Sequence, residues 1–400
     1  MPDEAAPERV GVRVARARKR RGLTQHGLAQ KASYSRSHIA QVEAGHKMAT
    51  PSFVAAIAAA LGVDPAEIYG QPFRGRTPKA DAVHAAIPDI RRTLVFVEVP
   101  PDLDGPARPV AELRAELAAL RELQAASRHR QVGTRLPSVL EELTWHAHDS
   151  GAPQVWADLF RAHETAADLC RKLGYHDLAN SCLNAARESA ARNEDPHLPL
   201  LVALRRSLLL AALAQWRPAL ALLDRATGAV DDTRPDAAEV RGTAHLRAAI
   251  VAARAGDGAT AWEHHGTATE LRRASDEPGD VHGVTTGFVP ANVAVHGAAV
   301  AVELGDMDEA VRRDMRLGAR SLAGLVPERR AHHEIDMARA HVETGDHDRA
   351  LARLVSAQDT APQMTRYHPS ARALVTHLVD VRRTLPEPLR RLHHLTAGWQ

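Results

Sequence analysis

The chain has 400 residues, with 51 Lys and Arg against 49 Asp and Glu, and its net charge of +2 indicates no partner by itself. This length allows two or three domains with sizeable cores. Aromatic residues are only 4% of the sequence, and the abundant Ala, Leu and Arg favour packed helices over sheets. No apolar stretch is long enough to cross a membrane, and no secretion signal is visible. We therefore expect a cytoplasmic, all-α protein without a membrane partner.

Residues 23–45, LTQHGLAQKASYSRSHIAQVEAG, predict two short helices joined by a tight turn. Thr24 and Ser35 carry a hydroxyl that accepts a hydrogen bond from a free amide of the first turn, so each is expected to cap a helix. The apolar residues between them recur at helical spacing, and Gly45 suits the left-handed position that ends a helix. Taken alone, this pattern also fits an ordinary helical hairpin.

The wider segment from about Arg9 to Tyr69 resembles the helix-turn-helix of Cro and the phage repressors, also called the XRE family. The residues that carry the resemblance are Leu23-Thr24-Gln25, Leu28-Ala29, Ser35, Ile39, Glu43, Gly45 and Ala60-Leu61-Gly62-Val63. The resemblance implies a five-helix domain that binds specific DNA sequences. The chain departs from the family pattern at Ser33, where a turn glycine is common, and in the slightly longer loop 46–51.

The second helix carries donor-rich side chains near its N-terminus, where a helix in the major groove meets base edges. Base contacts are expected from Arg36, Ser37, His38 and Gln41. Phosphate contacts are implied by the resemblance for Thr24, Gln25, Ser35 and Lys47, although the longer loop leaves the role of Lys47 open. The resemblance also implies a buried brace, Arg18 with Glu43, between the first helix and the end of the recognition helix.

Basic charge is concentrated on this segment. Residues 1–79 hold 13 Lys and Arg against six Asp and Glu, a net charge of +7, whereas residues 80–400 hold 38 and 43, a net charge of −5. The basic run from Arg16 to Arg21 lies beside the predicted recognition helix, so we expect it to follow DNA phosphates. A solvated helix end would also tolerate such a run.

Proline, glycine and arginine interrupt the helical pattern after this domain. The clusters at 70–78 and 100–106 mark breaks in regular structure. Closely spaced prolines give a semi-rigid spacer, and a short amphipathic helix from Asp81 to about Val97 fits between the two clusters. We expect this segment to be a connector, and a dimerisation or docking helix is the alternative. The expected units are a DNA-binding domain at 1–70, a proline-rich linker at 71–107 and a helical-repeat sensor and dimerisation domain at 108–400.

One short element recurs in the helical remainder of the chain, with starts 40, 42, 49 and 40 residues apart. The copies are GYHDLA at 174–179, AQWRPA at 214–219, GDGATA at 256–261, GDMDEA at 305–310 and GDHDRA at 345–350. The first residue can end one helix, polar residues can cap the next, and the last alanine allows close packing. The element resembles the turn of tetratricopeptide repeats, which implies an α-solenoid with a binding groove. An unrelated helical array is the alternative.

The stretch 285–296, TTGFVPANVAVH, interrupts the phase of these repeats. It places Asn292 and His296 four residues apart, on one helix face. In tetratricopeptide grooves, asparagine side chains hold the backbone of an extended peptide, so Asn292 is the expected ligand contact, with His296 and Arg254 as neighbours. In the alternative interpretation, Asn292 caps a helix and His296 packs inside a wall.

No zinc-binding HExxH or CxxC motif and no phosphate-binding glycine loop occurs in the sequence, so we expect no metal, no cofactor and no enzymatic activity. The overall plan resembles bacterial regulators that join an XRE domain to a tetratricopeptide-like sensor, including the peptide-pheromone receptors of Gram-positive bacteria. The sequence thus predicts a homodimeric transcriptional regulator that binds a palindromic operator in double-stranded DNA and responds to a peptide or small-molecule effector. A protein-interaction scaffold, or a partner-regulating repeat protein with secondary DNA binding, remains the alternative.

Overall fold

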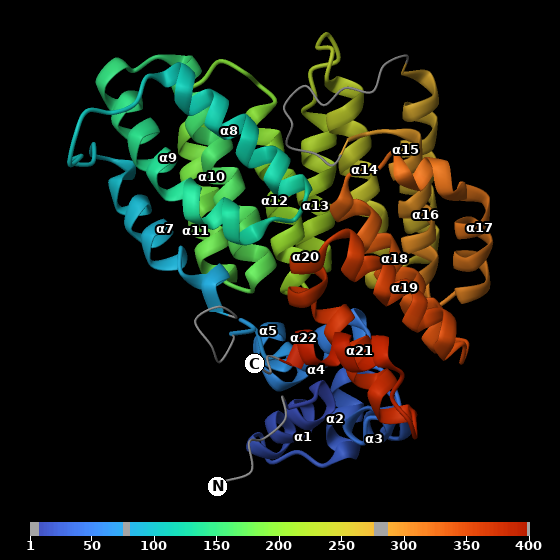
Figure 1. Ribbon diagram of the computed structural model, residues 1–400. Coiled ribbons are helices and arrows are strands. Elements are labelled where there is room, and N and C mark those ends of the chain that lie inside the picture. Colours follow the sequence, from blue (N-terminus) through green and yellow to red (C-terminus); the bar gives the residue numbers. More distant parts are fainter. Residues whose placement is uncertain (1–7, 75–80, 276–286, 398–400) are drawn as a thin grey trace, which may run out of the picture.

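The computed structural model describes residues 8–74, 81–275 and 287–397 (Figure 1). Every regular element in these ranges is a helix, which confirms the all-α expectation. None of the helices within them combines the length and the apolar character that a membrane crossing requires.

The N-terminal domain consists of five helices around a small apolar core. They are α1 (Val10–Arg20), α2 (Gln25–Ala32), α3 (Arg36–Glu43), α4 (Pro51–Leu61) and α5 (Pro65–Tyr69). Leu28 from α2, Ile39 from α3 and Phe53 from α4 are fully buried in that core. The predicted pair of helices, α2 and α3, is therefore packed through its apolar faces, as the helical spacing required.

Local chemistry fixes both ends of the turn between α2 and α3. The Thr24 hydroxyl accepts a hydrogen bond from the Gly27 N–H at 3.0 Å, and the Ser35 hydroxyl accepts one from the His38 N–H at 3.1 Å. Ser33, which replaces the common turn glycine, adopts the left-handed conformation that glycine would supply, with φ of 57°. The turn thus keeps its shape at the modest steric cost of a Cβ in this region.

Five antiparallel helical pairs form the central array. The pairs are α10 (Pro153–Leu173) with α11 (His176–Ala190), α12 (Leu198–Ala212) with α13 (Trp216–Gly228), α14 (Ala237–Arg254) with α15 (Gly258–Ala274), α16 (Pro290–Leu304) with α17 (Met307–Ala323), and α18 (Pro327–Glu343) with α19 (His347–Thr360). Each turn falls on a copy of the repeated element, which confirms the tetratricopeptide-like interpretation.

The chemistry of the repeated element explains these turns. Its first residue is left-handed in every copy, with φ between 60° and 88°, at Gly174, Ala214, Gly256, Gly305 and Gly345. Its last residue is buried where the two helices meet, at Ala179, Ala219, Ala261, Ala310 and Ala350. In three copies an aspartate caps the second helix; Asp306, for example, accepts a hydrogen bond from the Glu309 N–H at 3.0 Å. A small residue at the crossing lets the helices approach closely.

Further helices flank the pairs on both sides. Before them come η1 (Ala82–His84), α7 (Ile87–Thr93), η2 (Leu94–Val97), α8 (Val110–Ala125) and α9 (His129–Ser150), and after them come α20 (Pro362–Tyr367), α21 (Pro369–Val381) and α22 (Glu387–Ala397). The segment expected to be a spacer is packed instead. Ile87 and Ile90 are buried in the core of the array, and the His84 ring bonds the Phe73 carbonyl and the Tyr175 hydroxyl, at 3.1 Å each. Apolar residues at helical spacing make this segment fold as short helices against the array, although prolines flank it.

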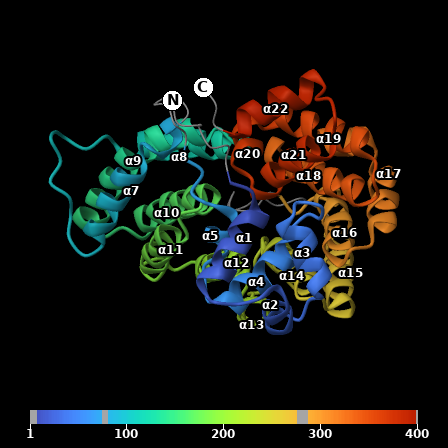
Figure 2. The same ribbon diagram turned by 90° about the horizontal axis from the view of Figure 1, so that it is seen from below.

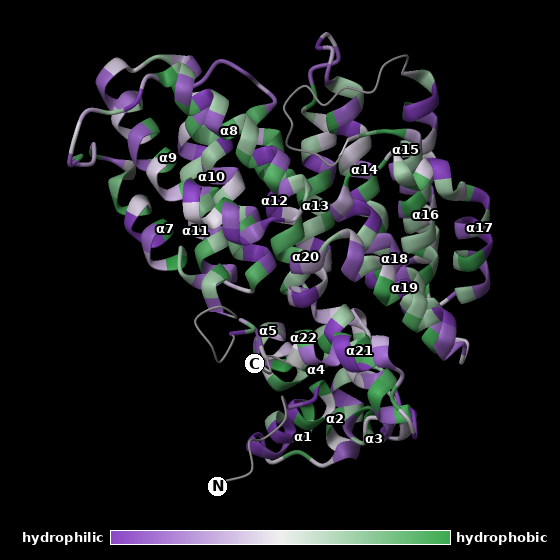
Figure 3. Cartoon of the chain, viewed as in Figure 1, coloured by the Kyte–Doolittle hydropathy of each residue, from purple (hydrophilic) through white to green (hydrophobic). Residues whose placement is uncertain are grey.

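The array curves around the N-terminal domain. Seen from below in Figure 2, α9 to α11 lie on one side of α1 to α5, and α15 to α19 lie on the other. The curvature brings the first and last pairs of the array near each other. The Lys172 ammonium of α10 lies 2.8 Å from the carboxylate of Glu328 in α18, which is 156 residues later in the chain. Figure 3 shows apolar colour along inner helices such as α16 and mostly polar colour on the outer α17.

The buried alanine of the repeated element provides a test of this packing. Ala219 and Ala221 both lie on α13, but Ala219 is fully buried and Ala221 is exposed. We expect Ala219→Leu to lower the free energy of unfolding by about 1–3 kcal/mol, because the added carbons force the helices apart. Ala221→Leu is the matched control and should change it by less than about 0.5 kcal/mol. Urea denaturation followed by circular dichroism measures both, and an equal effect would contradict the assigned helix contact.

Candidate nucleic-acid interface

Three of the four predicted base-reading residues form an open surface. Arg36, Ser37 and Gln41 are exposed on α3, and α3 lies with α2 at the edge of the molecule farthest from the array (Figure 1). Their side chains occupy the first two turns of the helix. A short helix with exposed donors in its first turns has the form that enters a major groove.

His38 differs from the sequence-based expectation. Its ring stacks on Phe53 at 5.1 Å, with the planes 8° apart, and meets Tyr34 edge to face at 5.0 Å. Burial, together with the nearby Lys47 charge, lowers the pKa of the imidazole. His38 thus belongs to the packing between α3 and α4, because its position on α3 is turned about 100° from that of Ser37.

A charged brace holds α3 in place. Arg18 on α1 donates to both carboxylate oxygens of Glu43, at 2.7 and 2.9 Å, and also to the Leu23 carbonyl at 2.8 Å. Gln25 donates to the same carboxylate at 2.9 Å. Burial alone would raise the pKa of the Glu43 carboxyl, but the hydrogen bonds from Arg18 and Gln25 outweigh it and lower that pKa. A bidentate arginine fixes the orientation of α3 as well as its distance from α1.

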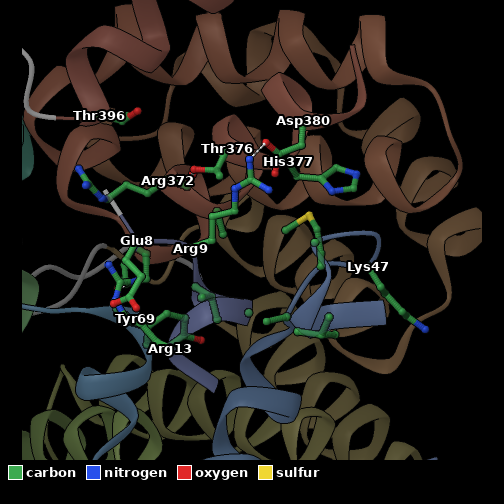
Figure 4. A pocket seen from close by; sticks show the side chains of 18 of the residues that line it. Glu8, Arg9, Arg13, Lys47, Tyr69, Arg372, Thr376, His377, Asp380 and Thr396 are labelled. Carbon is green, nitrogen blue, oxygen red and sulfur yellow. Dashed lines mark hydrogen bonds and ion pairs between the residues drawn. The ribbon is translucent and has the colours of Figure 1, made fainter. Parts of the chain in front are cut away.

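The predicted phosphate contacts surround this brace. Thr24 and Ser35 are exposed at the N-termini of α2 and α3, where helix dipoles favour anions. Gln25 has one amide hydrogen engaged with Glu43, which leaves its second for another acceptor. Lys47 follows α3, and Figure 4 shows its side chain pointing away from the C-terminal helices.

Several arginines of the basic run also have partners within the domain. Arg21 donates to the carbonyls of Leu61 and Gly62 at 2.7 and 2.9 Å, which closes the end of α4. Arg16 pairs with Glu8 at 2.5 Å, and Arg20 pairs with Glu67. Arginine side chains on a short helix reach neighbouring carbonyls and carboxylates of the same domain.

The three residues expected to bind a ligand have internal partners instead. Asn292 is only 4% exposed, and its amide donates to the Gly287 carbonyl at 2.7 Å. His296 bonds the Asn292 carbonyl at 2.7 Å, and burial beside Arg329 lowers its pKa to about 3, so its ring is neutral. Both residues therefore secure the start of α16. Residues 285 and 286 of the stretch lie outside the described residues.

Arg254 joins helices of the array. It donates to Glu303 at 2.9 Å, and Arg339 donates to the other carboxylate oxygen at 2.9 Å. Burial alone would raise the pKa of the Glu303 carboxyl, but the two guanidiniums hold it at about 2. This triad joins α14, α16 and α18, because each of these helices contributes one of the three charged side chains.

The sequence did not indicate where the N-terminal domain is attached. Met48, in the loop after α3, is 8% exposed and belongs to the same apolar cluster as Leu374 and Leu378 of α21. Arg9 pairs with Asp380 of α21 at 2.6 Å (Figure 4). The sequence offered one sign of this contact, the apolar residue Met48 in an otherwise polar loop. Only the curvature of the array shows which surface covers it.

The brace gives a pH-dependent prediction. The depressed pKa of Glu43 means that its stabilisation is complete above the ordinary value of 4.5 and is lost as the pH falls through the lower folded value. Glu43→Gln should weaken the domain at neutral pH by about 3 kcal/mol or more, since it leaves Arg18 without its buried partner. The difference in stability between Glu43→Gln and the wild type should shrink as the pH falls below 4.5, because the wild-type carboxyl then becomes neutral as well.

Hydrogen exchange of the amides in residues 24–44, compared with the wild type at each pH, measures this difference. Glu67→Gln is the matched control, because it removes a carboxylate from a surface pair of the same domain, and such pairs contribute about 0–1 kcal/mol. Equal effects of the two substitutions at neutral pH would contradict the brace.

The N-terminal domain is similar to a known protein family. Residues 9–68 match the family described as Helix-turn-helix domain. No curated protein matches the chain. Among solved structures, BtubC (BKLC) from P. vanneervenii has a TM-score of 0.38 and 20% identity and covers 67% of this chain and 97% of its own. Pseudomonas aeruginosa pilF has a TM-score of 0.34 and 18% identity, with 63% and 93% covered. Bacillus thuringiensis PlcR, in a complex with the peptide PapR7 and DNA, has a TM-score of 0.30 and 13% identity, with 67% and 95% covered.

The family match covers α1 to α4 and nearly all of α5, the helices that position the exposed side chains of α3. The helical pairs that follow have the turn chemistry of tetratricopeptide repeats. Residues 9–68 therefore form a helix-turn-helix domain, and a tetratricopeptide-like helical array follows it.

Proposed function

We propose that the protein is a sequence-specific transcriptional regulator of the XRE type. The observation that carries this proposal is the exposed triplet of Arg36, Ser37 and Gln41 on the first turns of α3, held in position by the Arg18–Glu43 brace. Arginine and glutamine are the side chains that form bidentate contacts with guanine and adenine in the major groove. His38 is not part of the proposed reading surface.

Phosphate contacts complete the proposed mode of binding. The N-termini of α2 and α3 offer unpaired backbone amides beside Thr24, Gln25 and Ser35, and Lys47 adds a positive charge after α3. Contacts of this kind fix the orientation of the domain on the duplex, while base contacts supply specificity. The proposed interface therefore uses both helices of the motif.

The protein is proposed to act in the cytoplasm as a homodimer on a palindromic operator. A single recognition helix reads only a short half-site, so two copies related by symmetry give useful affinity and specificity. The helical array is proposed to respond to an effector and to change operator affinity. Such coupling requires an effector that binds the DNA-competent arrangement more or less tightly than the alternative arrangement.

Selection of bound duplexes from a random pool with the full-length protein tests the proposal. We expect enrichment of an inverted repeat whose half-sites lie about 10 base pairs apart or a multiple of that distance. Analytical ultracentrifugation of the complex should then give two chains per duplex. Enrichment of no sequence would leave the protein-interaction scaffold as the better assignment.

Substitutions on α3 and the following loop should separate specificity from affinity. Arg36→Ala and Gln41→Ala should each cost about 1–3 kcal/mol and relax the preference at one operator position. Lys47→Ala should weaken all duplexes alike, because a phosphate contact carries no sequence information. Gln30→Ala, an exposed glutamine of α2 outside the proposed surface, is the matched control and should bind as the wild type does. Fluorescence anisotropy with the selected operator and single-base variants measures these differences, and a uniform loss for Arg36→Ala would assign it to phosphate instead.

A further inference from the structure

A pocket lies between the helix-turn-helix domain and the C-terminal helices. Its volume is about 90 Å³, and its walls come from α1, the loop after α3 and the end of α5 on one side and from α21 and α22 on the other. Figure 4 shows side chains of both units directed towards this space, with Arg9 and Asp380 paired across it. Small-molecule sites occur preferentially at such boundaries between structural units.

Two guanidinium groups line the pocket, and neither forms a short ion pair among the described residues. Arg372 on α21 lies over the Phe73 ring at 4.1 Å and donates to the Arg366 carbonyl at 3.4 Å, and no carboxylate pairs with it among the described residues. Arg13 on α1 donates to the Tyr69 carbonyl at 3.0 Å, while its distance to Glu8 is 3.8 Å. Glu8 lies closer to Arg16, at 2.5 Å, so it does not neutralise Arg13 fully.

The two charges oppose each other in a partly dry setting. Burial, together with the charges of Arg13 and Arg366, lowers the pKa of Arg372 to about 10. Burial also lowers the pKa of Arg13. Two cations held near each other with little water are destabilising unless an anion joins them. The fold therefore retains an unfavourable pair of charges that a bound oxyanion would relieve.

The remaining lining is partly apolar. Phe73, Met48 and Val42 contribute carbon surface to the walls of the pocket. A ligand that placed an oxyanion between Arg13 and Arg372 would thus have room to lay an apolar body on this surface. The combination of a few convergent polar groups with apolar walls is typical of sites for small organic molecules.

We propose that this pocket binds a small organic acid, with its carboxylate between Arg13 and Arg372 and its apolar body against Phe73 and Met48. A planar guanidinium binds a carboxylate through two parallel hydrogen bonds, which suits this assignment. The site differs from the groove residues Asn292, His296 and Arg254.

The position of the pocket gives the ligand a route to the DNA-reading surface. Val42 and Gly45, at the C-terminal end of the recognition helix, line the same space as α21. A ligand that bridges the two walls changes the free energy of the contact between the DNA-binding domain and α21, and so the operator affinity. This consequence rests on the proposed function, whereas ligand binding itself does not.

Isothermal titration calorimetry of the full-length protein with benzoate tests the proposal. Benzoate should bind with a dissociation constant of about 1 mM or tighter, a free energy of about −4 kcal/mol. Benzamide, which has the same shape without the charge, should bind at least about tenfold more weakly. Inorganic phosphate, a second oxyanion, should compete with benzoate. Equal binding of benzamide, or no binding of benzoate, would overturn the proposal.

Arginine variants identify the site. Arg372→Gln should weaken benzoate binding about tenfold or more, since it removes a charged donor whose hydrogen bonds to a carboxylate are stronger than those of a neutral amide. Arg366→Gln is the matched control, because Arg366 also lies over an aromatic ring, Tyr367, but does not line the pocket. Equal affinities of the two variants would overturn the assignment.

Circular dichroism shows whether Arg372→Gln still folds. If it does not, a second variant tests the site. Ala373→Leu keeps every charge and fills part of the pocket, so it should also weaken benzoate about tenfold, and wild-type affinity in this variant would contradict the proposed site. These assays contain no DNA, so their failure is distinct from failure of the operator selection. If benzoate binds but leaves operator affinity unchanged, the site stands and its regulatory consequence is wrong.

Discussion

The close approach of paired helices at one buried alanine is the constraint on which the rest of the structure depends. A left-handed residue ends the first helix of each pair, and an alanine without a long side chain lets the second helix return in contact with it. Repetition of this crossing gives the array its curvature. The curvature brings Glu328 of α18 to Lys172 of α10 and places α21 and α22 beneath the array.

Buried charge pairs then hold neighbouring elements in a fixed order. Arg18 and Glu43 join α1 to α3, and Glu303 joins α14 to α18 through Arg254 and Arg339. Such pairs are costly to break because a single partner would remain charged in a dry place. They explain why many arginines of this chain serve the fold, including Arg254, which the sequence suggested as a ligand contact.

The helix-turn-helix domain is attached at one end and open at the other. Met48 and Arg9 fix it to α21, next to the C-terminal end of the recognition helix, whereas Arg36, Ser37 and Gln41 remain exposed along that helix. Under the proposed function, a change in the contact with α21 would alter the orientation of these exposed side chains without covering them. This geometry connects the proposed DNA binding with the proposed acid-binding pocket.

The sequence by itself determined what depends on local chemistry. Caps at Thr24 and Ser35, the left-handed turns and the buried alanines follow from residue type and spacing, because neighbours along the chain satisfy these requirements. Only the tertiary structure decided which polar side chains are available. His38 turned inward onto Phe53, and Asn292 bonded Gly287. The pocket between Arg13 and Arg372 has the same origin, because residues so far apart in the chain meet only through the curvature of the array.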